Sequence, residues 1–319
     1  MAYFSPKPAE GFHFNSILYT KKDWVATITV NRPQVFNAMN TEVLEEMAQA
    51  LLDVSWDDSI AVLVLTAAGE KAFCTGGDVN EYATTMLRRP RNYWKWFTYF
   101  DRVITLLLDL GKPAIARING MVVGGGNELH LACDLSIAAE HARIRQIGPS
   151  VGSVPAGGAT QWLPVLIGDR RAREMCFVNE WVEARQALEW GLVNQVVPYK
   201  ELDGAVAALC EKLINKFPEC TRYTKEQVNF WKKLSWAATV GHARDWLTLH
   251  YSSIEPYEGM RAFVEKRPVD FIGLRKRAAT GGSSEFLWGP YTQTCPSCQA
   301  KGIPETFRFC GSCGASLKQ

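Results

Sequence analysis

The sequence predicts an α/β protein whose functional residues lie where strands end. Buried apolar strands are expected at residues 61–66 and 113–118, and each leads within a few residues to a glycine-rich turn, at residues 73–78 and 121–129. A third buried strand is expected at residues 136–139. Repeated strand–turn–helix units are typical of α/β folds with sites at strand ends, and they argue against a helical bundle or a β-sandwich.

The N-terminal part follows the same pattern. Residues 25–30 alternate between apolar and polar side chains, as expected of a strand, and the Asn-Arg-Pro sequence at residues 31–33 then forces a turn. A helix is expected to start at Asn40, because glutamates fill its first turn and apolar residues recur on one face. The apolar residues of this face are Val43, Leu44, Met47 and Leu51.

Residues 84–110, between the two glycine turns, are rich in aromatic side chains and are expected to be mostly helical. Two interpretations are open. The aromatic residues form either a core helix or one wall of a substrate pocket, since the segment closely follows the first glycine turn. Glu81 and Tyr82, just before it, are candidates for the lining of an acyl pocket. The aromatic residues are Tyr93, Trp94, Trp96, Phe97, Tyr99 and Phe100.

Residues 201–277 have a helical, amphipathic pattern. Such a tail usually packs on its own domain or on a neighbouring subunit. Glycine and serine are frequent in the next segment, residues 278–292, which predicts a flexible linker. The apolar residues of the helical tail include Leu202, Val206, Leu209, Leu213, Trp231, Leu234, Trp246 and Leu249.

Composition and charge exclude several classes of function. The 319 residues are 47% hydrophobic and 21% charged, with a formal net charge of +2. A globular protein without a basic excess is indicated, so no nucleic-acid partner is expected. The first residues lack the pattern of a signal peptide, and no stretch approaches the roughly 20 apolar residues that a membrane span needs. We therefore expect a soluble cytoplasmic protein.

Four of the nine cysteines, namely Cys295, Cys298, Cys310 and Cys313, lie in the last 25 residues. They form two knuckles at the spacing of a zinc site, and four thiolates close a tetrahedral shell around Zn²⁺. The metal is therefore expected to be structural, and the zinc ribbon at residues 293–319 to dock a protein partner or another part of the enzyme. Disulfides are the alternative.

The remaining cysteines lie in apolar patterns and are expected to be buried in a reducing compartment. Cys74 is next to the first glycine turn, but nothing nearby in the sequence would lower its pKa, so a reactive thiol is the weaker interpretation. No motif indicates a metal or catalytic role for any of the five histidines. These other cysteines are Cys74, Cys133, Cys176, Cys210 and Cys220.

The two glycine turns can carry chemistry together. Each is an apolar run that ends in glycines before a helical pattern, and backbone N–H groups in such turns can point at a developing negative charge. Two turns can thereby form an oxyanion hole, although glycines can also serve only to make tight turns. Glu128 follows the second turn by one helical turn, where its carboxylate can move protons beside the hole.

A series of blocks, in this order, resembles the crotonase (enoyl-CoA hydratase/isomerase) superfamily over residues 14–277. The resemblance implies a crotonase-like ββα superhelix with the acyl-CoA site at residues 14–200, and a C-terminal helical region for oligomerisation at residues 201–277. A homotrimer or hexamer is expected. The blocks are Asn31-Arg32-Pro33, Phe73-Cys-Thr-Gly-Gly-Asp78, Lys112-Pro113, Gly124-Gly-Gly-Asn-Glu128, Cys133-Asp134, Gly152-Ser-Val-Pro-Ala-Gly-Gly-Ala-Thr-Gln161 and Ala187-Leu-Glu-Trp-Gly-Leu-Val-Asn194.

Members of this family bind acyl-CoA thioesters, so the resemblance implies CoA as part of the substrate. They stabilise an enolate of the thioester carbonyl, and by position the N–H groups that do so are those of Gly77 and Gly125. Enoyl-CoA hydratases use two glutamates to activate one water. Glu128 matches the first glutamate, whereas Gly148 stands at the position of the second. Simple two-glutamate hydration is therefore in doubt.

A glycine at that position is similar to two sub-groups: dihydroxynaphthoyl-CoA synthase, in which the space can hold bicarbonate, and ring-opening hydrolases of alicyclic acyl-CoAs. Pro155 departs from the synthase, which has an aspartate there. The closest pattern is that of 6-oxocyclohex-1-ene-1-carbonyl-CoA hydrolase of aromatic compound degradation. A C-terminal segment that supplies CoA contacts in these sub-groups resembles residues 257–267, which implies Phe263 and Lys266 as contacts with CoA.

Three functions remain as hypotheses. The leading one is a lyase or hydrolase that adds water to an α,β-unsaturated, cyclic or aromatic-pathway acyl-CoA, with ring-opening carbon–carbon hydrolysis as a possible second step. Double-bond isomerisation is the second, since it needs only one acid/base residue. The third is a non-catalytic acyl-CoA-binding scaffold that recruits partners through its zinc ribbon.

Overall fold

The computed structural model describes residues 7–282, 293–304 and 306–317. These residues form two compact units. Unit 1 comprises Met1–Asp78, Lys95–Pro149 and Val154–Arg244, and unit 2 comprises Val79–Trp94, Ser150–Ser153 and Asp245–Gln319. Most of the predicted linker lies outside the described residues, and the helix before it, α12, ends at Ala279. No helix in the described ranges is long and apolar enough to cross a membrane.

Unit 1 contains two β-sheets. The six-stranded sheet has the order β1-β2-β3-β5-β7-β10, with β1 antiparallel to β2 and the other neighbours parallel. Its strands are Ile17–Lys22, Val25–Val30, Val62–Ala67, Ala114–Ile118, Leu135–Ala139 and Gln195–Val197. The four-stranded sheet has the order β4-β6-β8-β9, and only β9 is antiparallel to its neighbour. Its strands are Ala72–Cys74, Met121–Val123, Arg143–Arg145 and Val182–Glu183.

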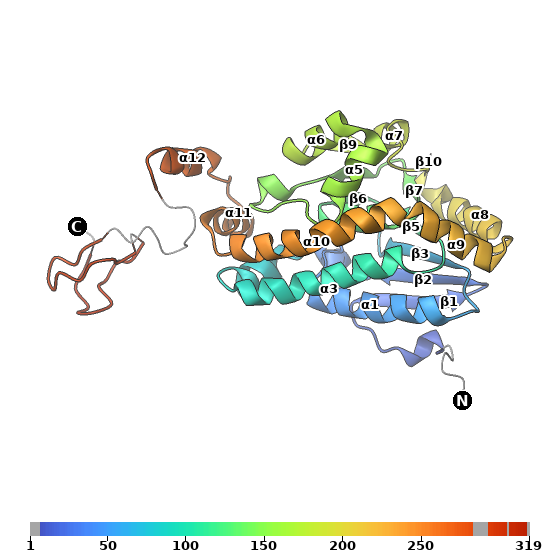
Figure 1. Cartoon of the computed structure of the whole chain (residues 1–319), viewed down its shortest axis with the longest axis horizontal. Coiled ribbons are helices and arrows are strands. Elements are labelled where there is room, and N and C mark those ends of the chain that lie inside the picture. The colour runs from blue at the N-terminus through green and yellow to red at the C-terminus, as the bar shows by residue number, and fades with distance from the viewer. Residues whose placement is uncertain (1–6, 283–292, 305, 318–319) are drawn as a thin grey trace. The chain divides into compact units, whose positions relative to one another are not determined.

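Helices of unit 1, such as α1 and α8, lie beside these sheets (Figure 1). Those wholly in unit 1 are α1 (Thr41–Trp56), α4 (Gly125–Ala132), α5 (Ala159–Ile167), α6 (Asp169–Phe177), α7 (Ala184–Glu189), α8 (Leu202–Ile214) and α9 (Pro218–Val228). The α3 helix (Pro90–Leu108) and the α10 helix (Phe230–His250) each have residues in both units. Unit 2 also holds α2 (Val79–Glu81), a π-helical turn at Tyr82–Met86, α11 (Ile254–Glu265) and α12 (Phe271–Ala279).

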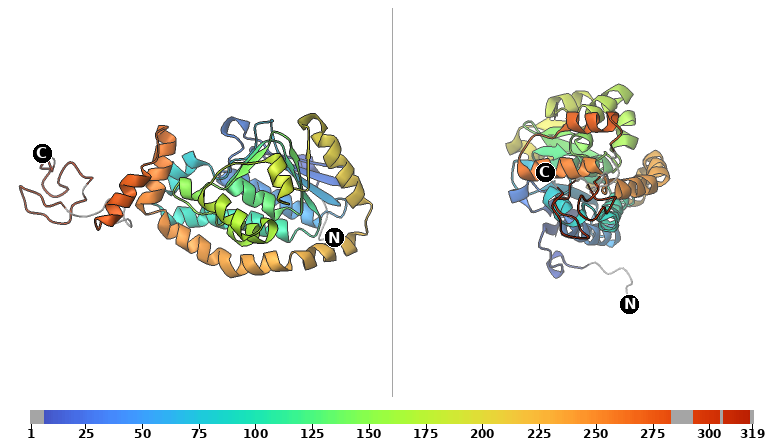
Figure 2. Two further views of the ribbon diagram at one scale, coloured as in Figure 1. Left: turned by 90° about the horizontal axis from the view of Figure 1, so that it is seen from above. Right: turned by 90° about the vertical axis from the view of Figure 1, so that its left-hand side faces the viewer.

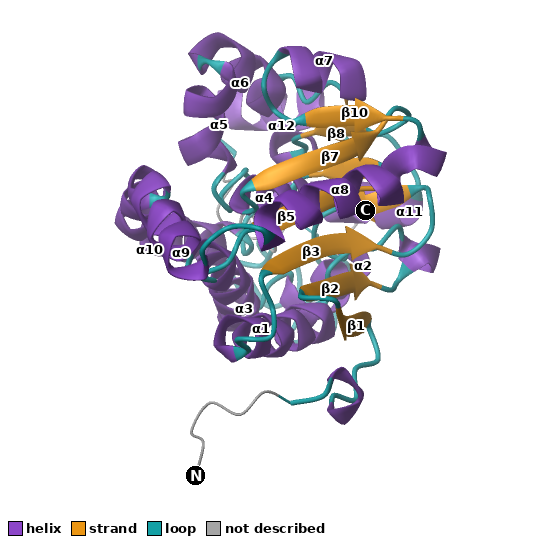
Figure 3. Cartoon of the chain, turned by 90° about the vertical axis from the view of Figure 1, so that its right-hand side faces the viewer, coloured by secondary structure: helices purple, strands orange, loops and turns teal. Residues whose placement is uncertain are grey.

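Burial explains why the six-stranded sheet forms. Every residue of β3 is buried, as expected of a central parallel strand with both faces covered. On one face, Val62 and Ile115 pack in a cluster with Leu202 and Val206 of α8, and Figure 3 shows this helix lying over the strands. The expected strands at residues 25–30, 61–66, 113–118 and 136–139 are therefore confirmed, with small shifts at their ends.

The predicted helices are also confirmed. The side chain of Asn40 caps α1 by accepting a hydrogen bond from the N–H of Val43 at 3.0 Å. In unit 1, α10 lies beside α3, where the Trp236 indole donates to the Thr105 hydroxyl at 3.1 Å (Figure 2). The C-terminal region is helical as expected, but the side chains of Leu234 and Leu249 are largely exposed among the described residues.

Candidate active site

The two glycine turns of unit 1 meet. Gly76 follows β4 and has a φ of +89°, and Gly124 follows β6 and has a φ of +55°. Glycine adopts both of these backbone conformations more readily than other residues. A Cβ added to Gly125 would lie 3.6 Å from the Cα of Gly76. The residues assigned to the oxyanion hole, Gly77 and Gly125, are thus brought together by the parallel pairing of β4 with β6.

Hydrogen bonds fix the first turn to the start of α1. The N–H of Met39 donates to the Gly76 carbonyl, and the N–H of Asp78 donates to the Met39 carbonyl, both at 2.8 Å. Asp78 also forms a 2.9 Å ion pair with Arg32. Among the described residues, the N–H groups of Gly77 and Gly125 donate to no other group. Both are available to an oxygen that enters between the turns.

The second turn opens α4, which carries Glu128. A Cβ on Gly126 would lie 2.1 Å from the Cys74 carbonyl oxygen, so glycine is needed for this helix to start against β4. Glu128 lies in the first turn of α4 and is 5% exposed. The positive N-terminal end of α4 and a buried carboxyl group are therefore next to the glycine turns.

Backbone N–H groups at the start of α5 hold the Glu128 carboxylate. The N–H of Gly157 donates to Oε1 at 2.6 Å, and the N–H of Ala159 also stabilises the ionised group. A Cβ on Gly157 would lie 2.3 Å from Oε2 of Glu128, so a side chain at this position would displace the carboxylate. Sequence reasoning missed this contact, although two glycines before a helix start are a signal for it.

Aromatic side chains of α3 cover this carboxylate. A Cβ added to Gly157 would lie 2.4 Å from Cε1 of Phe100, and a Cβ added to Gly125 would lie 3.7 Å from Cζ of Phe100. Trp96 stacks on Phe100 with ring centres 5.7 Å apart. The core interpretation is confirmed, because Trp96, Phe97 and Phe100 are buried. Phe100 also borders the positions of Gly125 and Gly157, and its role as a wall of a substrate pocket stays a prediction.

Burial sets the proton affinity of Glu128. Burial raises the pKa of the carboxyl to about 7, and the N–H groups of Gly157 and Ala159 limit the rise. Cys176 of α6 also faces this charge, since burial and then Glu128 raise the pKa of its thiol to about 11. A carboxyl with a pKa of about 7 is present in both its acidic and basic forms at neutral pH, as acid/base chemistry requires.

Other buried polar groups lie near Glu128 in α4. His130 is held by the Asn127 amide oxygen at 3.2 Å and by the Ser136 hydroxyl at 3.1 Å, and burial lowers the pKa of its imidazole to about 4. His130 is therefore neutral at physiological pH and has a packing role. Cys74 is not a reactive thiol, because burial raises its pKa to about 12.

The residues implied as CoA contacts lie in unit 2. Phe263 is exposed on α11, and Lys266 caps the C-terminus of this helix with a φ of +53°. Tyr82, a candidate for the pocket lining, is buried with Tyr93 and Tyr251, whose rings stack 3.7 Å apart. Nothing in the sequence pattern predicted that Tyr251 would pack against the other two tyrosines.

The four C-terminal cysteines form one cluster, with all their sulfur atoms within 4.8 Å of one another. Cys295 and Cys313 are 3.6 Å apart and Cys298 and Cys310 are 3.7 Å apart, too far for disulfide bonds. Ligands at about 2.3 Å around tetrahedral zinc have sulfur atoms roughly 3.8 Å apart, so the cluster fits this metal. Backbone N–H groups of Cys298 and Ser312 also point at the sulfurs of Cys295 and Cys310.

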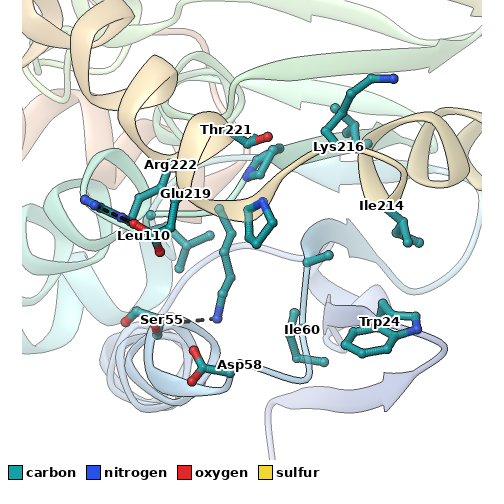
Figure 4. Close-up of a pocket in the computed structure, with 16 residues that line it drawn as sticks. Trp24, Ser55, Asp58, Ile60, Leu110, Ile214, Lys216, Glu219, Thr221 and Arg222 are labelled. Carbon is teal, nitrogen blue, oxygen red and sulfur yellow. Dashed lines mark hydrogen bonds and ion pairs between the residues drawn. The ribbon is translucent and has the colours of Figure 1, made fainter.

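A pocket of about 590 Å³ lies elsewhere in unit 1. Ile60 and Pro113 line it just before β3 and β5, whereas the glycine turns follow β4 and β6. Figure 4 shows Trp24 and Ile60 on one side and the Arg222–Glu219 ion pair on the other. None of the predicted site residues lines this pocket, so it is separate from the glycine turns.

The comparisons with known proteins agree with one another. A family model described as enoyl-CoA hydratase/isomerase matches residues 20–274, which ends before the cysteine cluster. An enoyl-CoA hydratase structure from Bacillus anthracis is 32% identical, with a TM-score of 0.65, and covers 81% of this chain and 100% of its own. An enoyl-CoA hydratase from Mycobacterium avium subsp. paratuberculosis K-10 is 25% identical, with a TM-score of 0.74 and coverage of 81% and 99%. An enoyl-CoA hydratase/isomerase from Pseudoalteromonas atlantica T6c is 26% identical, with a TM-score of 0.73 and coverage of 81% and 100%. The fold implied by the sequence resemblance is confirmed.

Proposed function

Because the chain belongs to the enoyl-CoA hydratase/isomerase family, we propose that it adds water to an α,β-unsaturated acyl-CoA whose acyl part is cyclic. The observation that supports this most is the buried Glu128 carboxyl beside Gly77 and Gly125. The N–H groups of these glycines hold the thioester oxygen as it gains negative charge. Phe100, which borders Gly125 and Gly157, suits a flat or cyclic acyl group better than a polar one.

Glu128 both accepts and donates a proton in this reaction. The ionised carboxylate takes a proton from water, whose oxygen bonds to Cβ of the substrate, and the electron pair of the double bond moves to the thioester oxygen as an enolate. Glu128 then returns the proton to Cα, and the enolate reverts to the thioester. No second carboxylate is present at position 148, so one residue performs both transfers.

The lone carboxylate also supports a second candidate function, double-bond isomerisation. In that reaction Glu128 removes a proton from one carbon of the substrate and returns it to another, and no water is consumed. Ring-opening hydrolysis after hydration would consume a second water. The number of oxygen atoms added therefore separates the three reactions.

The test is product analysis in ¹⁸O-labelled water with a panel of cyclic and linear enoyl-CoAs. Hydration of a cyclic substrate adds one labelled oxygen, and ring opening adds a second, whereas isomerisation adds none. Glu128→Gln should reduce kcat by roughly 100-fold or more. Thioester binding without turnover on every substrate would instead favour an acyl-CoA-binding scaffold, and near-normal turnover of Glu128→Gln would refute the assigned acid/base role.

We further propose that Cys295, Cys298, Cys310 and Cys313 hold a structural Zn²⁺. Four thiolates leave no open position on the metal, so the ion holds the ribbon together and takes no part in the acyl-CoA chemistry. The ribbon then serves to dock a protein partner. Phe263 and Lys266 are the proposed contacts with CoA, within a homotrimer or hexamer, and the cytoplasm is the proposed location.

A further inference from the structure

Two arginines of β8 share one indole ring in unit 1. The Cζ atom of Arg143 lies 4.2 Å from the ring centre of Trp181, and that of Arg145 lies 4.5 Å from it. The two arginines are two positions apart on one strand, so both side chains project from the same face of the sheet. Trp181 directly precedes β9, and the pairing of β8 with β9 brings it opposite Arg145 on that face.

These two guanidinium groups are not neutralised. No carboxylate in the described parts of the chain forms an ion pair with either one, including the exposed Glu183 opposite Arg143. Within the described ranges, the hydrogen bond of the Arg143 side chain goes to the sulfur of Met121, at 3.7 Å. The Nε–H of Arg145 is buried and has no acceptor among the described residues. Two adjacent cations are thus held together without the anion that would normally compensate them.

Other arginines of unit 1 with little exposed side chain are paired. Arg32 forms an ion pair with Asp78 at 2.9 Å, and Arg117 with Asp203 at 2.7 Å. Arg143 and Arg145 differ because an aromatic ring, and not a carboxylate, lies against them. Stacking on an indole orients a guanidinium and leaves its N–H groups free to bind an oxyanion.

We propose that Arg143, Arg145 and Trp181 form an anion site that binds a phosphate or carboxylate group. The indole holds the two forks of N–H donors in place, so little side-chain freedom is lost on binding. The terminal N–H groups of the two guanidinium forks then donate charge-assisted hydrogen bonds to the anion. The site uses none of the residues assigned to acyl-CoA chemistry, so its test can fail without refuting the proposed reaction.

The backbone connects this site with the second glycine turn. The carbonyl of Arg145 accepts a 3.0 Å hydrogen bond from the N–H of Gly124, which caps α4. An anion that fixes the Arg145 side chain therefore also restrains the strand end that supports Gly124. The bound group comes either from the phosphates of CoA or from a separate small oxyanion, and the two sources predict different competition.

The test is isothermal titration calorimetry at low ionic strength with inorganic phosphate, CoA and pantetheine as probes. Wild-type protein should bind phosphate, and the double variant Arg143→Gln/Arg145→Gln should bind it at least about tenfold more weakly. Arg171→Gln is the matched control, because Arg171 stacks on Trp190 at 5.2 Å on another element and should leave the affinity unchanged. Equal phosphate affinity in the wild type and the double variant would overturn the proposal.

Two further measurements make the outcome specific. Arg145→Lys keeps the charge but loses the planar fork of donors, so it should weaken phosphate binding several-fold. This single variant tests the proposal if the double variant fails to fold. If CoA supplies the anion, CoA but not pantetheine displaces phosphate, and the double variant binds CoA more weakly. If a separate oxyanion is bound, phosphate and CoA bind together, and only phosphate affinity falls in the variants.

Discussion

The backbone N–H of Gly157 donates a 2.6 Å hydrogen bond to Oε1 of Glu128 across 29 positions of the sequence. Together with the N–H of Ala159, this bond orients a buried carboxyl group. The missing side chain at position 157 is as important as the N–H, because it leaves room for the other carboxylate oxygen and for Phe100. The position of the acid/base group therefore depends on a glycine that touches no reacting atom.

Gly157→Ala tests this dependence. The new Cβ would lie 2.3 Å from Oε2 of Glu128, so the carboxylate must move, and a displacement of this kind costs roughly 100-fold in kcat. Steady-state kinetics with an enoyl-CoA substrate measure the loss, with circular dichroism to check folding. Gly204→Ala in α8 is the control, since a Cβ there meets nothing within 4 Å. Unchanged kcat in Gly157→Ala would refute the orienting role.

The pH dependence of the reaction follows from the burial of Glu128. The ionised carboxylate accepts the proton of water, so kcat/KM should rise with pH and level off above a pKa of about 7. Phe100→Ala admits water beside the carboxylate and should shift this limb to lower pH. The matched control is Phe97→Ala. The Phe97 side chain is as deeply buried as that of Phe100, and its ring packs edge-on against the Phe100 ring. Identical limbs in the two variants would contradict desolvation by Phe100.

The same pKa makes Glu128 a source of instability at high pH. The folded carboxyl has a pKa of about 7 against an ordinary value of 4.5, so between these values the folded protein binds more protons than the unfolded one. The free energy of unfolding therefore decreases as pH rises through this window, by roughly 3 kcal/mol in total. Glu128→Gln should raise Tm relative to wild type at pH 8 more than at pH 4. An equal effect at both pH values would argue against the raised pKa.

The sequence predicts the glycine turns as apolar runs that end in glycines. It does not predict that these runs are strands β4 and β6 of a second sheet, whose parallel pairing brings the two turns together. It does not predict how Glu128 is held, since the donor is a backbone N–H and carries no side-chain signal. The sequence also does not predict that the side chain of Leu234 is exposed. Apolar spacing on a helix is the same whether the face packs on its own domain or on another molecule.

The Lys225–Asp134 pair anchors α9 to the core. The Lys225 ammonium donates to Asp134 at 2.8 Å and to the carbonyls of Leu107 and Lys112, and its side chain is 5% exposed. Lys225→Met removes this donor from Asp134 and from both carbonyls and should reduce the free energy of unfolding by about 3 kcal/mol in urea denaturation. Lys233→Met, which breaks exposed ion pairs, should cost less than about 1 kcal/mol. Similar losses in both variants would contradict the anchoring role.

The cysteine cluster makes a prediction that separates metal binding from catalysis. Purified protein should contain one zinc per chain, and Cys295→Ser should lose it, because serine replaces a thiolate of the tetrahedral shell. Cys220→Ser is the control, since Cys220 lies outside the cluster and is exposed, so the expectation that it is buried was wrong. The family match ends at residue 274, so a chain truncated after residue 282 should retain its turnover of enoyl-CoA. Loss of turnover in both the truncated chain and Cys295→Ser, with the control active, would show that the ribbon takes part in the reaction. Metal loss with turnover intact would limit it to docking or stability.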